Sequence, residues 1–162
     1  MTVAERYENL KSKVLSRREE FLKFMEFVET ETEYLTAPAS TKFHLCKEGG
    51  LLEHSVNVAE TLLKIKNTLA AEIEDESCVI VGLLHDLGKV GMPSKSQYIK
   101  NLQKSYPPYK FNNNLMTEEE VQAIIYHDGQ YVDDNHSVAG HEEKLTLLLQ
   151  YADSWSGFVI EK

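Results

Sequence analysis

The sequence predicts an all-α fold, and three observations lead to this expectation. Residues 2–35 contain neither glycine nor proline, and their apolar positions recur at helical spacing. Further helical patterns follow in the middle and in the last third of the chain. The 162 residues suit one compact domain, which would bury about two thirds of its unfolded surface. Because the sequence has neither an internal repeat nor a linker-like stretch, we treat residues 1–162 as a single domain.

The N-terminal segment, residues 2–35, is expected to form one long helix or two consecutive helices. Val14, Phe21, Met25 and Val28 recur at steps of seven, four and three residues, which places them on one side of a helix. This apolar stripe can belong to the core of the domain, or it can form the seam of a homodimer. The sequence alone leaves both alternatives open.

Four further helices are expected later in the chain. The third of them has the clearest start, because Thr117 is followed three residues later by Glu120, and this pair forms a capping box. Before it, around residues 96–111, the helical pattern breaks, and we expect an irregular insert or a small β-hairpin there. The four helices cover, approximately, residues 51–70, residues 75 or 77 to 88 or 91, residues 117–127 and residues 141–156.

The charge balance excludes some classes of partner. The chain carries 26 acidic residues against 17 lysines and arginines, which gives a net charge of −9. A field of this sign repels phosphate backbones, so we do not expect the protein to bind extended nucleic acid. A small anionic substrate remains compatible with this charge, because a metal ion can invert the local potential inside a site.

The chain has the sequence character of a cytoplasmic protein. Its longest nearly continuous apolar stretch, from Val79 to Leu84, is far shorter than a membrane span. The N-terminus is charged from the fifth residue and lacks the apolar centre of a signal peptide. Cys46 and Cys78 are too few for a disulfide framework, and we interpret both as reduced and structural. We therefore expect no membrane partner.

The strongest local signal for chemistry is the doublet His85-Asp86, which ends an apolar helical stretch. Imidazole nitrogen and carboxylate oxygen are ligands that suit Fe, Mn, Co, Ni, Zn or Mg. In isolation, such a doublet is more often a polar helix end, with the histidine near the negative end of the helix dipole. Its surroundings in the sequence therefore decide its interpretation.

Two further residues change that interpretation. His54 lies on the first turn of the helix expected over residues 51–70, among apolar positions where a lone histidine is more often part of a core. Asp153 is a lone carboxylate in an apolar stretch, and buried carboxylates are rare unless they are paired or bound to metal. Two histidines and two aspartates from three helices would form an open metal site with room for water and substrate.

These residues resemble the pattern of the HD-domain metal-dependent phosphohydrolase superfamily. That family places a histidine on one helix, a His-Asp doublet at the end of the next and a distant aspartate on a later helix; here these are His54, His85, Asp86 and Asp153. The resemblance covers residues 38–157, which would form the metal-site core behind the N-terminal helical segment. Within this family, the chain is most similar to the subgroup of bacterial 3′–5′ exoribonucleases and related single-domain bacterial or phage members. Two stretches carry this similarity: Pro38-Ala39-Ser40-Thr41-Lys42 with His44, and Gly49-Gly50-Leu51-Leu52-Glu53-His54.

The resemblance implies an HD-domain-like helical bundle that hydrolyses a phosphomonoester or a phosphodiester, with a nucleotide or another small phosphate ester as substrate. His54, His85, Asp86 and Asp153 would hold the metal. One or two divalent ions are expected, with Fe, Mn, Ni, Co, Zn and Mg as candidates. Asp86, or a second metal ion, would help to deprotonate the attacking water. Lys89 would neutralise charge on the phosphate, or it would simply complement the negative end of its helix.

Three other histidines are candidates for a second metal or for substrate binding. His127 resembles the histidine that some family members use for a second metal, although it can also be a solvent-facing helix end. His141 precedes Asp153 by twelve residues, which puts the two about 120° apart on a straight helix. His44 lies in the loop before His54 and can line the same pocket. The chain lacks the Gly-Tyr-Pro motif after His127 that marks the cyclic-dinucleotide phosphodiesterases, which argues against that substrate and against a full second or third metal site.

Two alternative functions accompany the main hypothesis. The first is a non-catalytic regulatory HD domain that binds metal and nucleotide without turnover. The second is a 3′–5′ exonuclease-like phosphodiesterase, against which the net charge of −9 speaks for long substrates. The complete set of expected ligands together with Lys89 favours a catalyst over a regulatory domain, and it disfavours a plain helical scaffold.

Overall fold

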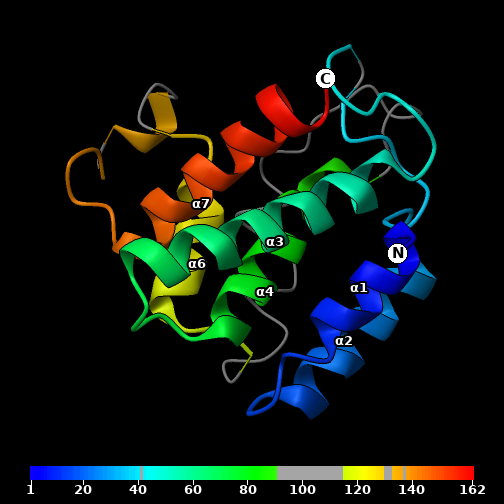
Figure 1. Ribbon diagram of the computed structural model, residues 1–162, viewed down its shortest axis with the longest axis horizontal. Helices are drawn as coiled ribbons and strands as arrows, with labels where there is room; N and C mark the ends of the chain where they lie inside the picture. Colours follow the sequence, from blue (N-terminus) through cyan, green and yellow to red (C-terminus); the bar gives the residue numbers. More distant parts are fainter. Residues whose placement is uncertain (41, 91–114, 130–132, 137) are drawn as a thin grey trace.

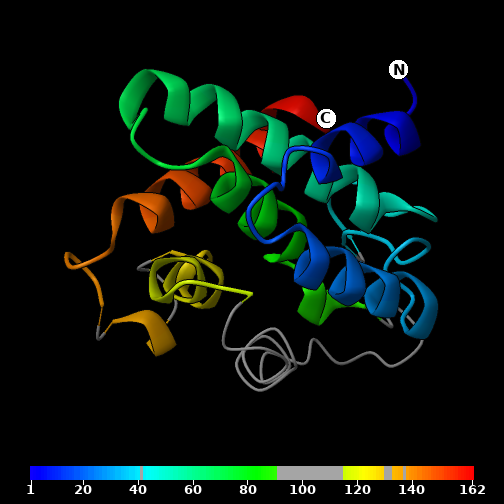
Figure 2. The same ribbon diagram turned by 90° about the horizontal axis from the view of Figure 1, so that it is seen from below.

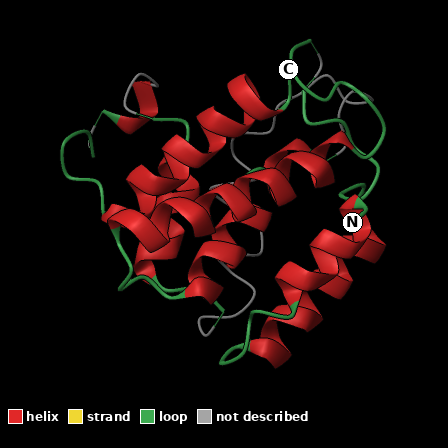
Figure 3. Cartoon of the chain, viewed as in Figure 1, coloured by secondary structure: helices red, strands yellow, loops and turns green. Residues whose placement is uncertain are grey.

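The computed structural model describes residues 1–40, 42–90, 115–129, 133–136 and 138–162. This part of the chain is helical and contains no strand (Figure 3), and the prediction of an all-α fold is confirmed. The insert expected around residues 96–111 lies outside the described residues. The helices are α1 (Val3–Lys11), α2 (Arg18–Glu31), α3 (Gly50–Leu69), α4 (Asp75–Leu84), the 3₁₀ turn η1 (Leu87–Lys89), α6 (Glu118–Tyr126), the 3₁₀ turn η3 (Asp133–Asn135), α7 (Lys144–Trp155) and the π-helical turn η4 (Ser156–Ile160).

Two helices, α1 and α6, begin with a capping box. Thr117 caps α6: its hydroxyl accepts from the Glu120 amide, while the Glu120 carboxylate accepts from the Thr117 amide, as the sequence predicts. Thr2 and Glu5 form the same capping box at the start of α1. The N-terminal segment forms two helices, and α7 begins three residues later than expected, at Lys144.

Helix α3 is the longest helix in the described part of the chain and crosses the middle of the view in Figure 1. It packs against α1, α4 and α7, whereas α6 packs against α4 and α7 from the other side, so that α4 and α7 lie between α3 and α6 in Figure 2. The apolar stripe of the N-terminal segment is fully buried in the core that these helices share, so it is core and not a dimer seam. No helix in the described ranges is both long and apolar enough to cross a membrane. Members of the core from different helices include Leu10, Phe21, Leu62, Leu83, Ile124 and Leu149.

A glycine sets the distance between α3 and α4. A Cβ atom on Gly82 would lie 2.6 Å from the Cα atom of Ala59, so only glycine allows the two backbones to approach this closely. The approach brings the end of α4 beside the first half of α3. The ring centroids of His54 and His85, one from each helix, are 5.3 Å apart as a result.

The described residues of the loop between α2 and α3, 32–40 and 42–49, fold against the start of α3. The Tyr34 hydroxyl is buried and donates to the Leu83 carbonyl at 2.7 Å, which ties this loop to the end of α4. A Cβ atom on Gly50 would lie 2.0 Å from the Leu45 carbonyl oxygen, so glycine is required where the loop meets the helix. This folding carries His44 to the side of His54.

Arg17 joins the N-terminal helices to the rest of the bundle. Its guanidinium donates to both carboxylate oxygens of Glu120 at 2.7 Å and to Glu76 at 2.9 Å. A further N–H donates to the Leu115 carbonyl at 2.9 Å. The Glu120 side chain is fully buried, so its charge depends on Arg17 for compensation.

We predict that Arg17→Ala lowers the free energy of unfolding by about 3 kcal/mol, because it leaves the Glu120 carboxylate buried without its cation. Urea denaturation followed by circular dichroism measures this change. Arg18→Ala is the matched control, since Arg18 is exposed, and it should change stability by no more than about 0.5 kcal/mol. Equal effects of the two substitutions would contradict the role assigned to Arg17.

Candidate metal centre

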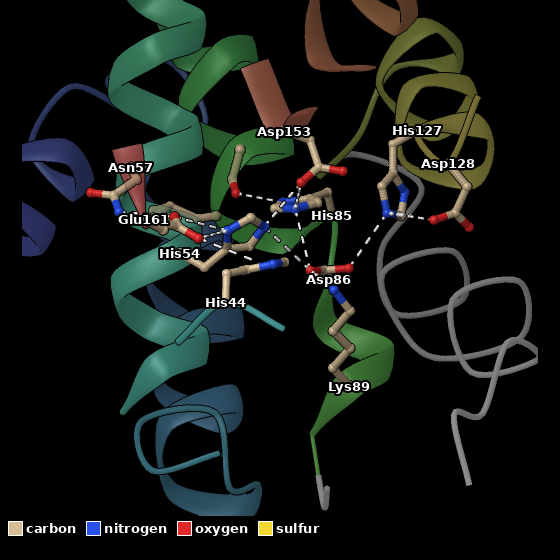
Figure 4. Close-up of polar contacts among 12 residues, drawn as sticks. His44, His54, Asn57, His85, Asp86, Lys89, His127, Asp128, Asp153 and Glu161 are labelled. Carbon is tan, nitrogen blue, oxygen red and sulfur yellow. Dashed lines mark hydrogen bonds and ion pairs between the residues drawn. The ribbon is translucent and has the colours of Figure 1, made fainter. Parts of the chain in front are cut away.

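Three histidines and two aspartates meet where α3, α4, α6 and α7 come together (Figure 4). His54 comes from the first turns of α3, His85 and Asp86 follow α4, His127 caps the end of α6, and Asp153 lies on α7. The histidines and Asp86 are buried, whereas about a quarter of the Asp153 side chain is exposed. The cluster is therefore open on the Asp153 side.

Two of the histidines are held in the same way. His85 Nδ1 lies 2.9 Å from the Gly82 carbonyl oxygen, and His127 Nδ1 lies 2.7 Å from the Ile124 carbonyl oxygen. A carbonyl only accepts hydrogen bonds, so each Nδ1 carries the proton and donates it. When such a ring is neutral, its Nε2 atom carries the lone pair, and the Nε2 atoms of both rings face the cluster.

His54 is held by a carboxylate instead. Its Nδ1 atom lies 3.0 Å from both carboxylate oxygens of Glu161, which is delivered by the chain after η4. Asn57, one turn along α3, donates from Nδ2 to the same carboxylate at 2.9 Å. His54 Nε2 faces the other way and lies 3.0 Å from Asp153 Oδ1. All three rings thus turn Nδ1 outward and Nε2 toward the aspartates.

Asp86 lies between the histidines. Its Oδ2 atom is 3.5 Å from Nε2 of both His54 and His85, and its Oδ1 atom is 3.4 Å from Nε2 of His127. The Lys89 ammonium, on η1, pairs with Oδ2. One oxygen of the Asp86 carboxylate therefore faces His54 and His85, and the other faces His127.

The donor atoms suit a divalent ion. The ligand atoms of His54, His85 and Asp86 all lie within 4.8 Å of one another, and so do those of His85, His127 and Asp153. Donors that bind one ion at about 2.1 Å lie up to about 4.2 Å apart, so small inward shifts would complete either set. Imidazole and carboxylate together match Zn and the other divalent transition metals.

The electrostatics of the cluster keep its carboxylates ionised. Burial acts to raise the pKa of Asp86, but Lys89 and the histidines outweigh it and hold that pKa well below its usual value. Burial likewise opposes ionisation of Asp153, yet His54 and its neighbours lower the pKa of Asp153 to about 2. Ionised carboxylates are the form that binds a metal ion.

The histidines divide into two kinds. Burial lowers the pKa of His85 to about 4, so this ring is neutral at neutral pH. Burial also acts to lower the pKa of His54 and His127, but the adjacent carboxylates outweigh it and raise both to about 9. Without a metal ion, the protein's own carboxylates thus favour two imidazolium rings, and an ion would replace their protons.

The structure brings together most of the candidates from the sequence. His54, His85, Asp86 and Asp153 meet, with Lys89 beside them, and His127 is buried in the same cluster rather than facing solvent. His44 packs against the His54 ring, with ring centroids 4.8 Å apart and the ring planes tilted by 41°, but its Nε2 faces Glu161 on the outer side. His141 is exposed in the turn before α7 and is not part of the cluster.

Sequence reasoning missed Glu161, Asn57 and Asp128. Asp128 Oδ1 lies 3.5 Å from His127 Nε2, and its position directly after that histidine was a signal that could have been used. Asn57 follows His54 by one helical turn and shares its face, which is also visible in the sequence. Glu161 has no comparable signal, because it lies 107 residues from the ring that it contacts.

The arrangement defines a class: a helical bundle with a buried histidine–aspartate cluster between its helices. The HD-domain family matches residues 51–154, and the chain belongs to this family. The matched range contains the three clustered histidines and both aspartates, and it excludes His44 and Glu161.

One curated relative carries a function in its name. The chain is 34% identical over 91 residues to a dihydroneopterin 2′,3′-cyclic phosphate phosphodiesterase of Methanocaldococcus jannaschii. The similarity covers 51% of this chain and 35% of that relative, so it spans about a third of the relative's length. A comparison with solved structures gave no match.

We predict that the chelator-treated protein loses stability as the pH rises from about 6.5 to about 9. In the folded protein, the pKa values of His54 and His127 are raised to about 9, so protonation of these rings stabilises the folded state. This contribution is complete at pH values below the pKa of an unfolded histidine, about 6.5, and is lost as the pH rises through about 9. Urea midpoints across this range measure the loss.

A His54→Gln, His127→Gln double variant separates this effect from other groups that titrate, because it should flatten most of the decline. The affinity of the protein for a divalent ion should follow the opposite trend and rise with pH, because protons cease to compete with the ion for the histidines. A chelator-treated protein whose stability increased over the same range would contradict the charge states assigned to these rings.

Proposed function

We propose that the chain is a divalent-metal-dependent phosphohydrolase that cleaves a phosphomonoester or a phosphodiester in a small substrate, with nucleotides as the first candidates. The observation that supports this most is the convergence of three histidine Nε2 atoms on two ionised carboxylates, in a chain of the HD-domain family. When bound there, a divalent ion supplies Lewis-acid activation of the phosphoryl group and of the attacking water.

We assign the first ion to His54, His85, Asp86 and Asp153. Nitrogen and oxygen donors of this kind suit Fe, Mn, Co, Ni and Zn, with Mg²⁺ as the hard-ion alternative. A second ion would use His127 and the Oδ1 atom of Asp86, because Oδ2 of the same carboxylate faces the other two histidines. Asp128, 3.5 Å from His127 Nε2, is the further oxygen donor available on that side.

The residues beside the ion site would act on the phosphate. The Lys89 ammonium is mostly buried and paired with Asp86, and burial acts to lower its pKa while Asp86 outweighs this and raises it. Lys89 therefore stays charged and can neutralise a phosphoryl oxygen at the edge of the cluster. In a one-ion form, His127 would carry a proton on Nε2 and offer a second positive group to the substrate.

A small phosphodiester deserves the first test among substrates. The name of the archaeal relative describes a phosphodiesterase for a 2′,3′-cyclic phosphate, and the net charge of −9 disfavours long nucleic acids. A panel should therefore include 2′,3′-cyclic nucleotides, nucleoside monophosphates and short oligonucleotides. Turnover of oligonucleotides alone would favour the exonuclease-like alternative, and binding of nucleotide without product would favour the regulatory one.

The first experiment is elemental analysis of untagged protein that was purified without chelator, followed by this panel. We predict one or two equivalents of a divalent metal and release of phosphate or of a phosphomonoester. Asp86→Ala should lose the metal and lower turnover at least about 100-fold, because the Lewis-acid contribution is worth several kcal/mol.

Asp133→Ala is the matched control, since Asp133 is exposed on η3 and outside the cluster, and it should keep both metal and turnover. Circular dichroism should show the same helix content in both variants. Full turnover in Asp86→Ala, or wild-type protein that takes up no divalent metal, would contradict the proposed function.

Lys89 has a separate expected effect. Lys89→Met should keep the metal content and lower kcat/KM roughly 10- to 100-fold, because it removes a charge-assisted contact to the phosphate rather than a ligand. Lys89→Arg retains the positive charge and should recover part of the loss. Steady-state kinetics with metal-saturated protein checks this, and a Met variant with unchanged kcat/KM would remove Lys89 from the mechanism.

A further inference from the structure

Glu161 is a carboxylate buried without a lysine or an arginine beside it. Its side chain is 1% exposed, and no described lysine or arginine forms an ion pair with it. Its contacts are His54 Nδ1, at 3.0 Å from both oxygens, the Asn57 amide at 2.9 Å and His44 Nε2 at 3.8 Å. A buried carboxylate costs folding free energy unless its charge is compensated. Here the charge is directed at the N–H of one imidazole, as Figure 4 shows.

The segment that delivers Glu161 has an unusual backbone. After Trp155, the last residue of α7, the chain continues into the π-helical turn η4, and the Glu161 amide donates to the Ser156 carbonyl at 3.1 Å. Single π-helical turns occur preferentially at functional sites. A Cβ atom on Gly157 would lie 3.3 Å from His44 Cε1, so glycine leaves room for the His44 ring against this turn.

Glu161 and His44, which contact the outer side of the His54 ring, lie outside the part of the chain that matches the HD-domain family. That match ends at residue 154, seven residues before Glu161, and it begins at residue 51, after His44. The matched range contains the candidate ligands, while the flanking segments cover the outer face of His54. The contacts on the outer side of His54 therefore come from segments that flank the matched family region.

We propose that Glu161 is a positioning residue of the metal centre: its carboxylate holds the Nδ1–H of His54 and so aims the Nε2 atom of that ring at the ion. The inference rests on the metal site of the proposed function and deepens it. A carboxylate on the outer nitrogen fixes the tautomer and orientation of a ligand histidine and increases its basicity. Removing such a partner typically lowers metal affinity 10- to 100-fold.

The test is a titration of metal-stripped full-length chain with Co²⁺, followed by its visible absorption. In Glu161→Ala the dissociation constant should rise roughly 10- to 100-fold. Glu161→Gln has the same shape and still accepts a hydrogen bond, so its loss should be smaller. Glu119→Gln is the matched control, because Glu119 is exposed on the first turn of α6, and its affinity should stay within about twofold of wild type.

A second measurement separates positioning from a purely structural role. In Zn²⁺-loaded wild-type protein, ¹⁵N-detected NMR should show a slowly exchanging Nδ1–H resonance from His54, and this signal should be lost to solvent exchange in Glu161→Ala. An unchanged resonance together with weaker metal binding would overturn the proposal, because the loss would then not pass through the His54 ring.

The remaining outcomes are also decisive. A Glu161→Ala variant that binds Co²⁺ as tightly as wild type would overturn the positioning role and leave the metal centre standing. Wild-type protein that binds no Co²⁺ would overturn both. Weaker binding together with loss of the resonance supports both.

Discussion

The geometry of the candidate centre depends on the hydrogen bonds that the Nδ1–H groups of its three histidines donate. His85 and His127 donate in the same way, because each caps a helix and its Nδ1–H bonds to a carbonyl three residues earlier. The last four carbonyls of a helix have no partner inside it, so each ring satisfies a group that the helix end leaves open. The same contact turns Nε2 into the space between the helices, where the aspartates lie. The hydrogen bond that completes each helix end therefore also sets the direction of the histidine ring.

The packing of the bundle serves this arrangement. Gly82 allows α4 to approach α3, and its carbonyl is also the acceptor for His85. The cluster itself places ionisable groups in the interior, which costs folding free energy that the carboxylate–imidazole contacts offset only in part. A bound cation would compensate Asp86 and Asp153 directly, so ion binding and folding are expected to be coupled.

The sequence predicted those features that depend on local chemistry or on the order of residues. The capping box at Thr117 located α6, and the order of His54, His85-Asp86 and Asp153 indicated residues that the bundle brings together. The burial of His127 could not be predicted, because it depends on how α6 packs against α4 and α7. The same holds for His44 and His141, which lie in loops whose paths the sequence does not specify. Glu161 is the clearest case, since its contact with His54 requires a π-helical turn and the packing of the C-terminal segment against α3.

The central claim is that the inward-facing Nε2 atoms and the two aspartates form a metal site. It is tested most directly by anomalous diffraction from crystals of the protein loaded with Zn²⁺ or Mn²⁺, recorded at the absorption edge of the metal. We predict a peak about 2.0–2.2 Å from Nε2 of His54 and His85 and from the oxygens of Asp86 and Asp153. A metal bound elsewhere, such as at the exposed His136 or His141, with no peak inside the bundle, would contradict it.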